Sequence, residues 1–206
     1  MPQFSQSDLS SIMVIDASAI INFIASKFSR EILKALPNRV IILEEVLTEL
    51  EAGAIKGRTD GRELKDMAES GVVEIVKLHS SHLPRYEELV IGPAASTLDD
   101  GEAATIAYTI GVQGIAIIDE RKAIRFCGEK YPEVFLGSSV DIFSHQSVQD
   151  ALGASKLKDS IVNALIGARM SVLPNKMDWV LDRIGPENSA LCKSLPRAAR
   201  EKFGQK

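Results

Sequence analysis

Four acidic residues stand at the ends of apolar segments that are far apart in the chain: Asp16, Glu49, Glu102 and Asp119. Residues 12–15 and 115–118, which precede the two aspartates, are short and rich in β-branched side chains, and this predicts buried parallel strands. Ligands of an open α/β sheet bind outside the carboxyl ends of the strands. Carboxylates gathered there must share a cation or take up a proton. The pattern predicts a metal site made only of oxygen ligands.

The first two of these residues also have ordinary structural explanations. Asp16 could cap the helix that follows its strand, although Ser18 could cap that helix equally well. A helical Glu such as Glu49 is usually solvated, but Val46 and Leu50 place it at the border of an apolar stripe. Within one turn of a strand end, it could reach the crevice.

The other two are equally ambiguous. Asp99 and Glu102 have the spacing of a capping box in front of an apolar run, which would explain both without any catalysis. Asp119 could cap the following helix, with Lys122 solvated, or Lys122 could serve phosphate contact beside the site. The sequence alone leaves these alternatives open.

The elements that must position these residues alternate along the chain. Strands are predicted at residues 12–15, 40–43, 72–76, 115–118 and 134–136. Helices are predicted at residues 19–35, from 44 to a stop at Gly53, at 61–70, at 99–110 with a stop at Gly111, and at 120–128. A further helix is predicted from about Ser138, and the last fifty residues are predicted to be helical, with breaks at Gly153, Pro174, Gly185 and Pro196.

This alternation predicts an α/β fold, with a central parallel β-sheet flanked by helices in three layers and additional C-terminal helices. We expect residues 10–150 to form the catalytic core. Residues 151–206 would be a helical extension packed on that core, so that the whole is a single domain. No linker composition marks a boundary between them.

Composition and charge exclude several classes of protein. No apolar run is long enough for a membrane span, and residues 1–8 lack the features of a signal peptide. The two cysteines and three histidines have no metal-ligand spacing, so free thiols, a cytoplasmic location and no His-based zinc site are expected. Residues 1–154 carry a net charge of −9 and residues 155–206 one of +5, which fits a metal-collecting cleft beside a surface that holds a polyanion.

Taken together, the four acidic segments resemble the motifs of the PIN-domain family, most closely its bacterial and archaeal VapC-like ribonuclease branch. The matching segments are Ile15-Asp16-Ala17-Ser18, Val46-Leu47-Thr48-Glu49-Leu50, Leu98-Asp99-Asp100-Gly101-Glu102 and Ile117-Ile118-Asp119-Glu120-Arg121. The turn at Gly137-Ser138-Ser139 and the helices around residues 161–184 extend the resemblance beyond the core. Ile124 stands where the branch usually has Arg, with Arg125 following.

The resemblance implies a hydrolase: an endoribonuclease that depends on Mg²⁺ or Mn²⁺ and cleaves single-stranded or looped RNA. Asp16, Glu102 and Asp119 would coordinate the metal, directly or through water. Glu49 would complete the acidic cluster and position the attacking water, and Ser18 would orient Asp16 by a hydrogen bond.

Partners also follow from the resemblance. RNA is the expected substrate, a homodimer is expected, and the protein could be the toxin of a toxin–antitoxin pair held by a cognate antitoxin. The alternative is a catalytically silent PIN scaffold that binds RNA or a protein partner. Retention of all four acidic positions argues against that alternative.

Overall fold

Five strands form one parallel sheet in the order β3-β2-β1-β4-β5. The computed structural model describes residues 12–93 and 97–201. The strands are β1 (Met13–Ile15), β2 (Val40–Leu43), β3 (Glu74–Val76), β4 (Ile115–Ile117) and β5 (Phe135–Gly137). Ile15 of β1 lies opposite Ile117 of β4, so the residues that follow these central strands emerge at the same edge of the sheet.

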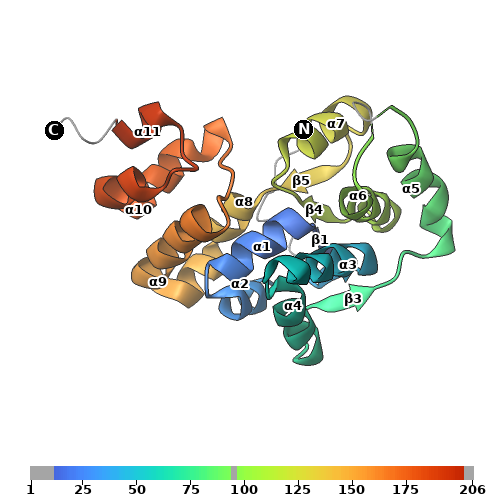
Figure 1. The fold of residues 1–206 in the computed structure, drawn as a ribbon, viewed down its shortest axis with the longest axis horizontal. Helices are drawn as coiled ribbons and strands as arrows, with labels where there is room; N and C mark the ends of the chain where they lie inside the picture. The colour runs from blue at the N-terminus through green and yellow to red at the C-terminus, as the bar shows by residue number, and fades with distance from the viewer. Residues whose placement is uncertain (1–11, 94–96, 202–206) are drawn as a thin grey trace.

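Helices cover the sheet and continue into a C-terminal group (Figure 1). The α-helices are α1 (Ala17–Ala25), α2 (Ser29–Ala35), α3 (Glu44–Ala52), α4 (Asp60–Glu69), α5 (Leu83–Val90), α6 (Asp100–Val112), α7 (Arg121–Lys130), α8 (Ser139–Phe143), α9 (Gln146–Gly167), α10 (Met177–Leu191) and α11 (Arg197–Glu201). Short 3-10 helices are η1 (Gly53–Lys56), η2 (Ser80–His82) and η4 (Pro174–Lys176). The predicted fold class, a parallel α/β sheet flanked by helices with further C-terminal helices, is confirmed.

The segment around β4 shows how the two faces of the sheet are filled. Successive side chains of a strand point to opposite faces. Ile115 and Ile117 join the larger core, which contains Phe23 of α1. Ala116 and Ile118 join a second cluster, which is built from α5, α6 and α7. A strand buried on both sides explains the continuous apolar run in the sequence.

Two details of the predicted helices are wrong. The single helix expected at residues 19–35 is two helices, because Lys27 between them adopts a left-handed conformation with φ of 67°. The hydroxyl of Ser26 accepts a hydrogen bond from the Phe28 N–H at 3.1 Å and stabilises the break. Gly111 does not stop α6, which ends after Val112. A Cβ at Gly111 would lie 2.0 Å from the ring of His82, so a larger residue there would displace that ring.

The first of the C-terminal helices, α9, lies against the first two helices of the chain, and the others pack behind it. Figure 1 shows α9 beside α1 and α2, and α10 beside α9. The predicted breaks at Gly153 and Gly185 are present as kinks with φ of 67° and 76°. An ion pair of 2.5 Å between Lys176 Nζ and Asp141 Oδ1 ties this group to α8.

None of the helices in the described residues combines the length and apolar character that a bilayer crossing requires. The start of the predicted core at residues 10–11, the segment at 1–8 and the end of the predicted extension at 202–206 lie outside the described residues.

Candidate active site

Asp16 leaves β1 and caps α1, and it is only 2% exposed. Its Oδ2 accepts hydrogen bonds from the Ser18 N–H at 3.2 Å and from the Ser18 hydroxyl at 2.7 Å. Its Oδ1 is buried and has no hydrogen-bond partner among the described residues. Burial and, to a smaller extent, Asp99 raise the pKa of Asp16 to about 6, against the opposing effect of the hydrogen bonds from Ser18. Asp16 is therefore a cap with one lone, desolvated oxygen.

Glu49 lies on α3, between the buried Val46 and Leu50. The residue as a whole is exposed, but its carboxylate turns toward the start of α6. A Cβ at Gly101 would lie 2.9 Å from Glu49 Oε2 and 3.8 Å from Asp16 Oδ1, so both oxygens border the same glycine. Desolvation, then Asp16 and Asp99, raises the pKa of Glu49 to about 7, while Arg58 lowers it. This carboxylate thus shares its surroundings with Asp16.

Glu102 and Asp99 form the predicted capping box at the start of α6. Asp99 Oδ1 accepts from the Glu102 N–H at 2.9 Å, and Glu102 Oε2 accepts from the Asp99 N–H at 3.4 Å. Glu102 is nevertheless 6% exposed, far less than capping requires. Desolvation first, and then Asp99 and Asp16, raises the pKa of Glu102 to about 8. Capping and membership of an acidic cluster therefore coexist in this residue.

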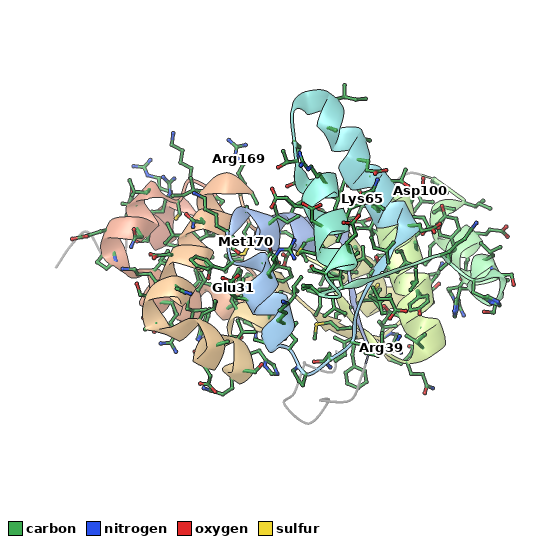
Figure 2. All side chains as sticks on the ribbon, turned by 90° about the horizontal axis from the view of Figure 1, so that it is seen from below. Glu31, Arg39, Lys65, Asp100, Arg169 and Met170 are labelled. Atoms are coloured by element: carbon green, nitrogen blue, oxygen red, sulfur yellow. The ribbon has the colours of Figure 1, made fainter. Side chains whose placement is uncertain are left out.

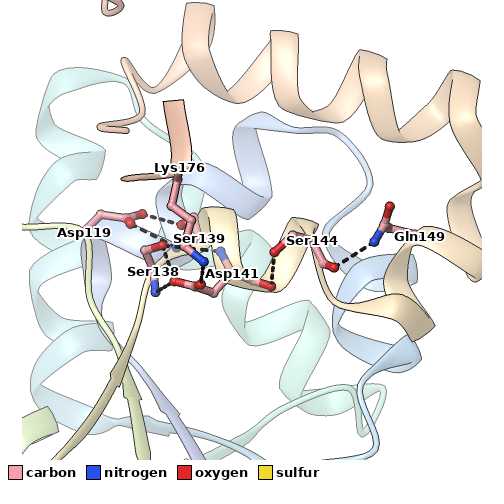
Figure 3. Close-up of polar contacts among 7 residues, drawn as sticks. All are labelled: Asp119, Ser138, Ser139, Asp141, Ser144, Gln149 and Lys176. Carbon is pink, nitrogen blue, oxygen red and sulfur yellow. Dashed lines mark hydrogen bonds and ion pairs between the residues drawn. The ribbon is translucent and has the colours of Figure 1, made fainter. Parts of the chain in front are cut away.

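Asp119 follows β4 and is held by side chains from two other elements. Figure 3 shows its carboxylate over the start of α8, where Oδ1 accepts from the Ser139 N–H at 3.0 Å and Oδ2 accepts from the Ser139 hydroxyl. The Asn22 amide donates to Oδ2 at 2.6 Å. Burial raises the pKa of Asp119, and the bonds from Ser139 and Asn22 oppose the rise. The possibility that Asp119 caps the next helix is wrong, because Glu120 caps α7.

Ser18 connects the ends of the two central strands. Its hydroxyl donates to Asp16 Oδ2 at 2.7 Å and accepts from the Asp119 N–H at 3.2 Å. A serine at this position therefore fixes the Asp16 side chain relative to the backbone of Asp119. The possibility that Ser18 caps α1 is wrong, since Asp16 fills that position.

The structure brings three of the four predicted site residues into one cleft. Asp16, Glu49 and Glu102 line a cleft of about 360 Å³, together with Ser18, Asp99, Glu120 and Lys122. Asp119 lines the neighbouring hollow of about 690 Å³, which shares Ser18, Ile21 and Glu120 with the cleft. As the side chains stand, no three acidic, His or Cys residues in the described part of the chain form a group that could hold a metal ion.

Sequence reasoning missed two residues that position Asp119. Asn22 is a buried amide among the apolar side chains of α1, and a polar residue in a buried stripe could have signalled it. Ser139 is fully buried and was singled out only as part of a turn. Both lie far from Asp119 in sequence, so no local pattern links them to it.

Residues 12–131 match the family model DUF3368, which is described as a PIN domain. The chain belongs to the PIN-domain family. The match contains all four acidic positions and Asn22, and it ends before Ser139 and the C-terminal helices. PIN domains are a family of nucleases. The comparison with curated proteins gives no match.

Proposed function

We propose that this PIN domain is an endoribonuclease that uses Mg²⁺ or Mn²⁺ to cleave phosphodiester bonds in single-stranded or looped RNA. One observation carries the proposal: the buried Oδ1 of Asp16 has no hydrogen-bond partner among the described residues. A desolvated carboxylate oxygen without a partner is costly. This oxygen lies in a cleft with the carboxylates of Glu49 and Glu102. A role as a cation ligand explains it better than a role in capping a helix, because a cap uses only the other oxygen of Asp16.

The chemistry of the donor set fits a hard divalent cation. Asp16, Glu49 and Glu102 supply only oxygen atoms, which Mg²⁺ and Mn²⁺ prefer, and the raised pKa values show that their charges lack compensation. Gly101 leaves open the space that borders Asp16 and Glu49. Since no three side chains are arranged around one point, a cation would draw the carboxylates together or be held partly through water.

In this proposal, Asp16 and Glu102 hold the cation and Glu49 positions the attacking water. Asp119, whose oxygens are occupied by Ser139 and Asn22, takes part through water. A divalent cation supplies a bound water of lowered pKa and a Lewis acid for the phosphoryl oxygen. Ser18 keeps Asp16 in place through its hydroxyl.

Cleavage of labelled single-stranded RNAs in Mg²⁺, Mn²⁺ or EDTA tests the proposal. We expect metal-dependent cutting by the wild type and a loss of more than about 100-fold in Asp16→Asn. Asp159→Asn is the matched control, because Asp159 is an exposed aspartate on α9 outside the cleft. Equal cutting by the wild type and Asp16→Asn would refute the assignment.

The silent-scaffold alternative predicts a different pattern in the same experiment. RNA would bind and stay intact, and calorimetry would detect no Mg²⁺ or Mn²⁺ binding that Asp16→Asn abolishes. The uncompensated carboxylates of the cleft favour the nuclease over the scaffold, because a binding surface for RNA gains nothing from them.

The VapC-like branch, the toxin role, a cognate antitoxin and a homodimer stay predictions. They are supported by the four acidic motifs, which occur along the chain in the same order as in that branch, and by the turn of small residues at Gly137. A gene for a small DNA-binding protein beside this one would favour the toxin role, and the molar mass of the purified protein in solution would test the homodimer.

A further inference from the structure

The hollow next to the acidic cleft is built from four separate segments. It has a volume of about 690 Å³ and is lined by α1, by residues 57–60 at the start of α4, by residues 119–120 after β4, and by residues 167–171 at the end of α9. Its border with the acidic cleft is formed by Ser18, Ile21 and Glu120, which line both. A chain that crosses the acidic cleft could therefore continue over this shared border into the hollow.

Two arginines, Arg58 and Arg169, line the hollow together with three carboxylates, those of Asp60, Asp119 and Glu120. Arg58 pairs with Asp60 through its Nε at 2.6 Å, and it also acts electrostatically on Glu49, in opposition to desolvation and the neighbouring carboxylates. Arg169 is exposed and forms no hydrogen bond or ion pair with any described residue. Figure 2 shows Arg169 extending outward from the turn that follows α9.

The backbone holds Arg169 at the rim in an unfavourable conformation. Its φ of 57° lies in the left-handed region, where glycine is the least costly residue. The next residue, Met170, is 1% exposed, and its N–H donates to the Ala164 carbonyl at 3.2 Å, so the turn is fixed to the end of α9. This backbone is that of a common helix C-terminus, and it holds the exposed guanidinium of Arg169 at the rim of the hollow, where a ligand can reach it.

The other residues that line the hollow are better suited to contact the sugar–phosphate backbone of a nucleic acid than to stack on its bases. None of the described residues that line the hollow is aromatic. Four small residues also line the hollow: Ala25, Gly57, Gly167 and Ala168. Without rings for stacking, single-stranded nucleic acid is held by its phosphates, and such binding is tolerant of sequence and sensitive to salt.

We propose that this hollow holds the RNA strand on one side of the cleaved bond, with Arg169 bound to a backbone phosphate beyond the acidic cleft. The inference rests on the proposed ribonuclease function and adds to it the path of the substrate. A guanidinium suits this role because its planar set of donors binds phosphate oxygens bidentately. Arg58 stands between the two sites and would screen the strand from Glu49 and its neighbours.

Arg169→Gly tests the inference without harming the fold, because glycine tolerates the left-handed backbone that arginine strains to adopt. Lys27→Gly is the matched control: Lys27 is exposed, is left-handed with φ of 67°, and lines neither the hollow nor the cleft. We would measure melting temperature, kcat and KM for a labelled single-stranded RNA, and its Kd by fluorescence anisotropy in EDTA at several salt concentrations.

We expect Arg169→Gly to melt no lower than the wild type and to raise KM and Kd about 5- to 10-fold with kcat unchanged. The slope of log K against log salt should fall by about 0.7, the value for one phosphate contact on a single strand. Lys27→Gly should match the wild type in KM, Kd and slope.

The outcomes separate this inference from the proposed function. If the wild type cuts RNA and Arg169→Gly equals Lys27→Gly, the path through the hollow is wrong and the ribonuclease stands. If the wild type binds RNA through Arg169 but cuts none, the path stands and the ribonuclease is wrong. If the wild type neither binds nor cuts RNA, both are overturned.

Discussion

Asp16→Asn should stabilise the metal-free protein at alkaline pH while abolishing its activity. Burial and Asp99 raise the pKa of Asp16 from 3.8 to about 6, a shift that corresponds to about 3 kcal/mol against the ionised form. Asparagine resembles the neutral form and removes this cost. Its new amide can be left without an acceptor, which costs about 1 kcal/mol. The net gain at pH 8 is about 2 kcal/mol, or about 4 to 8 °C in melting temperature.

The sign of the effect depends on pH. The folded state of the wild type binds the Asp16 proton more tightly than the unfolded state does, so this group lowers stability as pH rises from about 4 to about 6. The cost is full above that window and falls to about 1 kcal/mol at pH 4.5. The advantage of Asp16→Asn should therefore be present at pH 8 and close to zero at pH 4.5.

Thermal unfolding in EDTA at the two pH values measures this difference, with Asp159→Asn as the control that should not shift. If Asp16→Asn is less stable than the wild type by the same amount at both pH values, capping of α1 outweighs desolvation and the reasoning is wrong. Adding Mg²⁺ at ten times its Kd should stabilise the wild type by about 1.4 kcal/mol and leave Asp16→Asn unchanged.

Three further perturbations follow from the same cleft. The pKa values of Glu49 and Glu102 are raised to about 7 and about 8, so both carboxyl groups must lose a proton before Mg²⁺ can bind in the cleft. The affinity for Mg²⁺ and kcat/KM should therefore rise as pH increases from 6 to 8, and a flat profile would contradict this. Gly101→Ala places a Cβ 2.9 Å from Glu49 Oε2, so we expect calorimetry to show metal binding that is about 10-fold weaker. The melting temperature should not fall, because alanine favours the helix more than glycine does. Ser139→Ala removes a buried donor from the Asp119 carboxylate, and urea unfolding should show a loss of about 1 to 3 kcal/mol; a loss below 0.5 kcal/mol would show that Asp119 does not depend on this bond.

The helix breaks show where local patterns stop being informative. Apolar residues recur at helical spacing through residues 19–35, so the sequence gives no sign of the left-handed Lys27 that separates α1 from α2. Gly111 looks like a stop, but it lies inside α6 because the ring of His82 occupies the space of its side chain. A left-handed turn at Lys27 and a contact between helices at Gly111 thus override the helix propensity of the local sequence.

The sequence by itself determined the parallel sheet and the placement of Asp16 and Asp119 at one edge of it. Both follow from short apolar runs, whose burial fixes the strands, and from the rule that parallel strands end on the same side. The tertiary structure alone decided that Asp119 binds Ser139 and Asn22, that Gly101 makes room beside Asp16, and that Arg169 shares a hollow with Arg58. These contacts join residues distant in the chain, and desolvation and strain depend on the packing of whole elements, which no local pattern encodes.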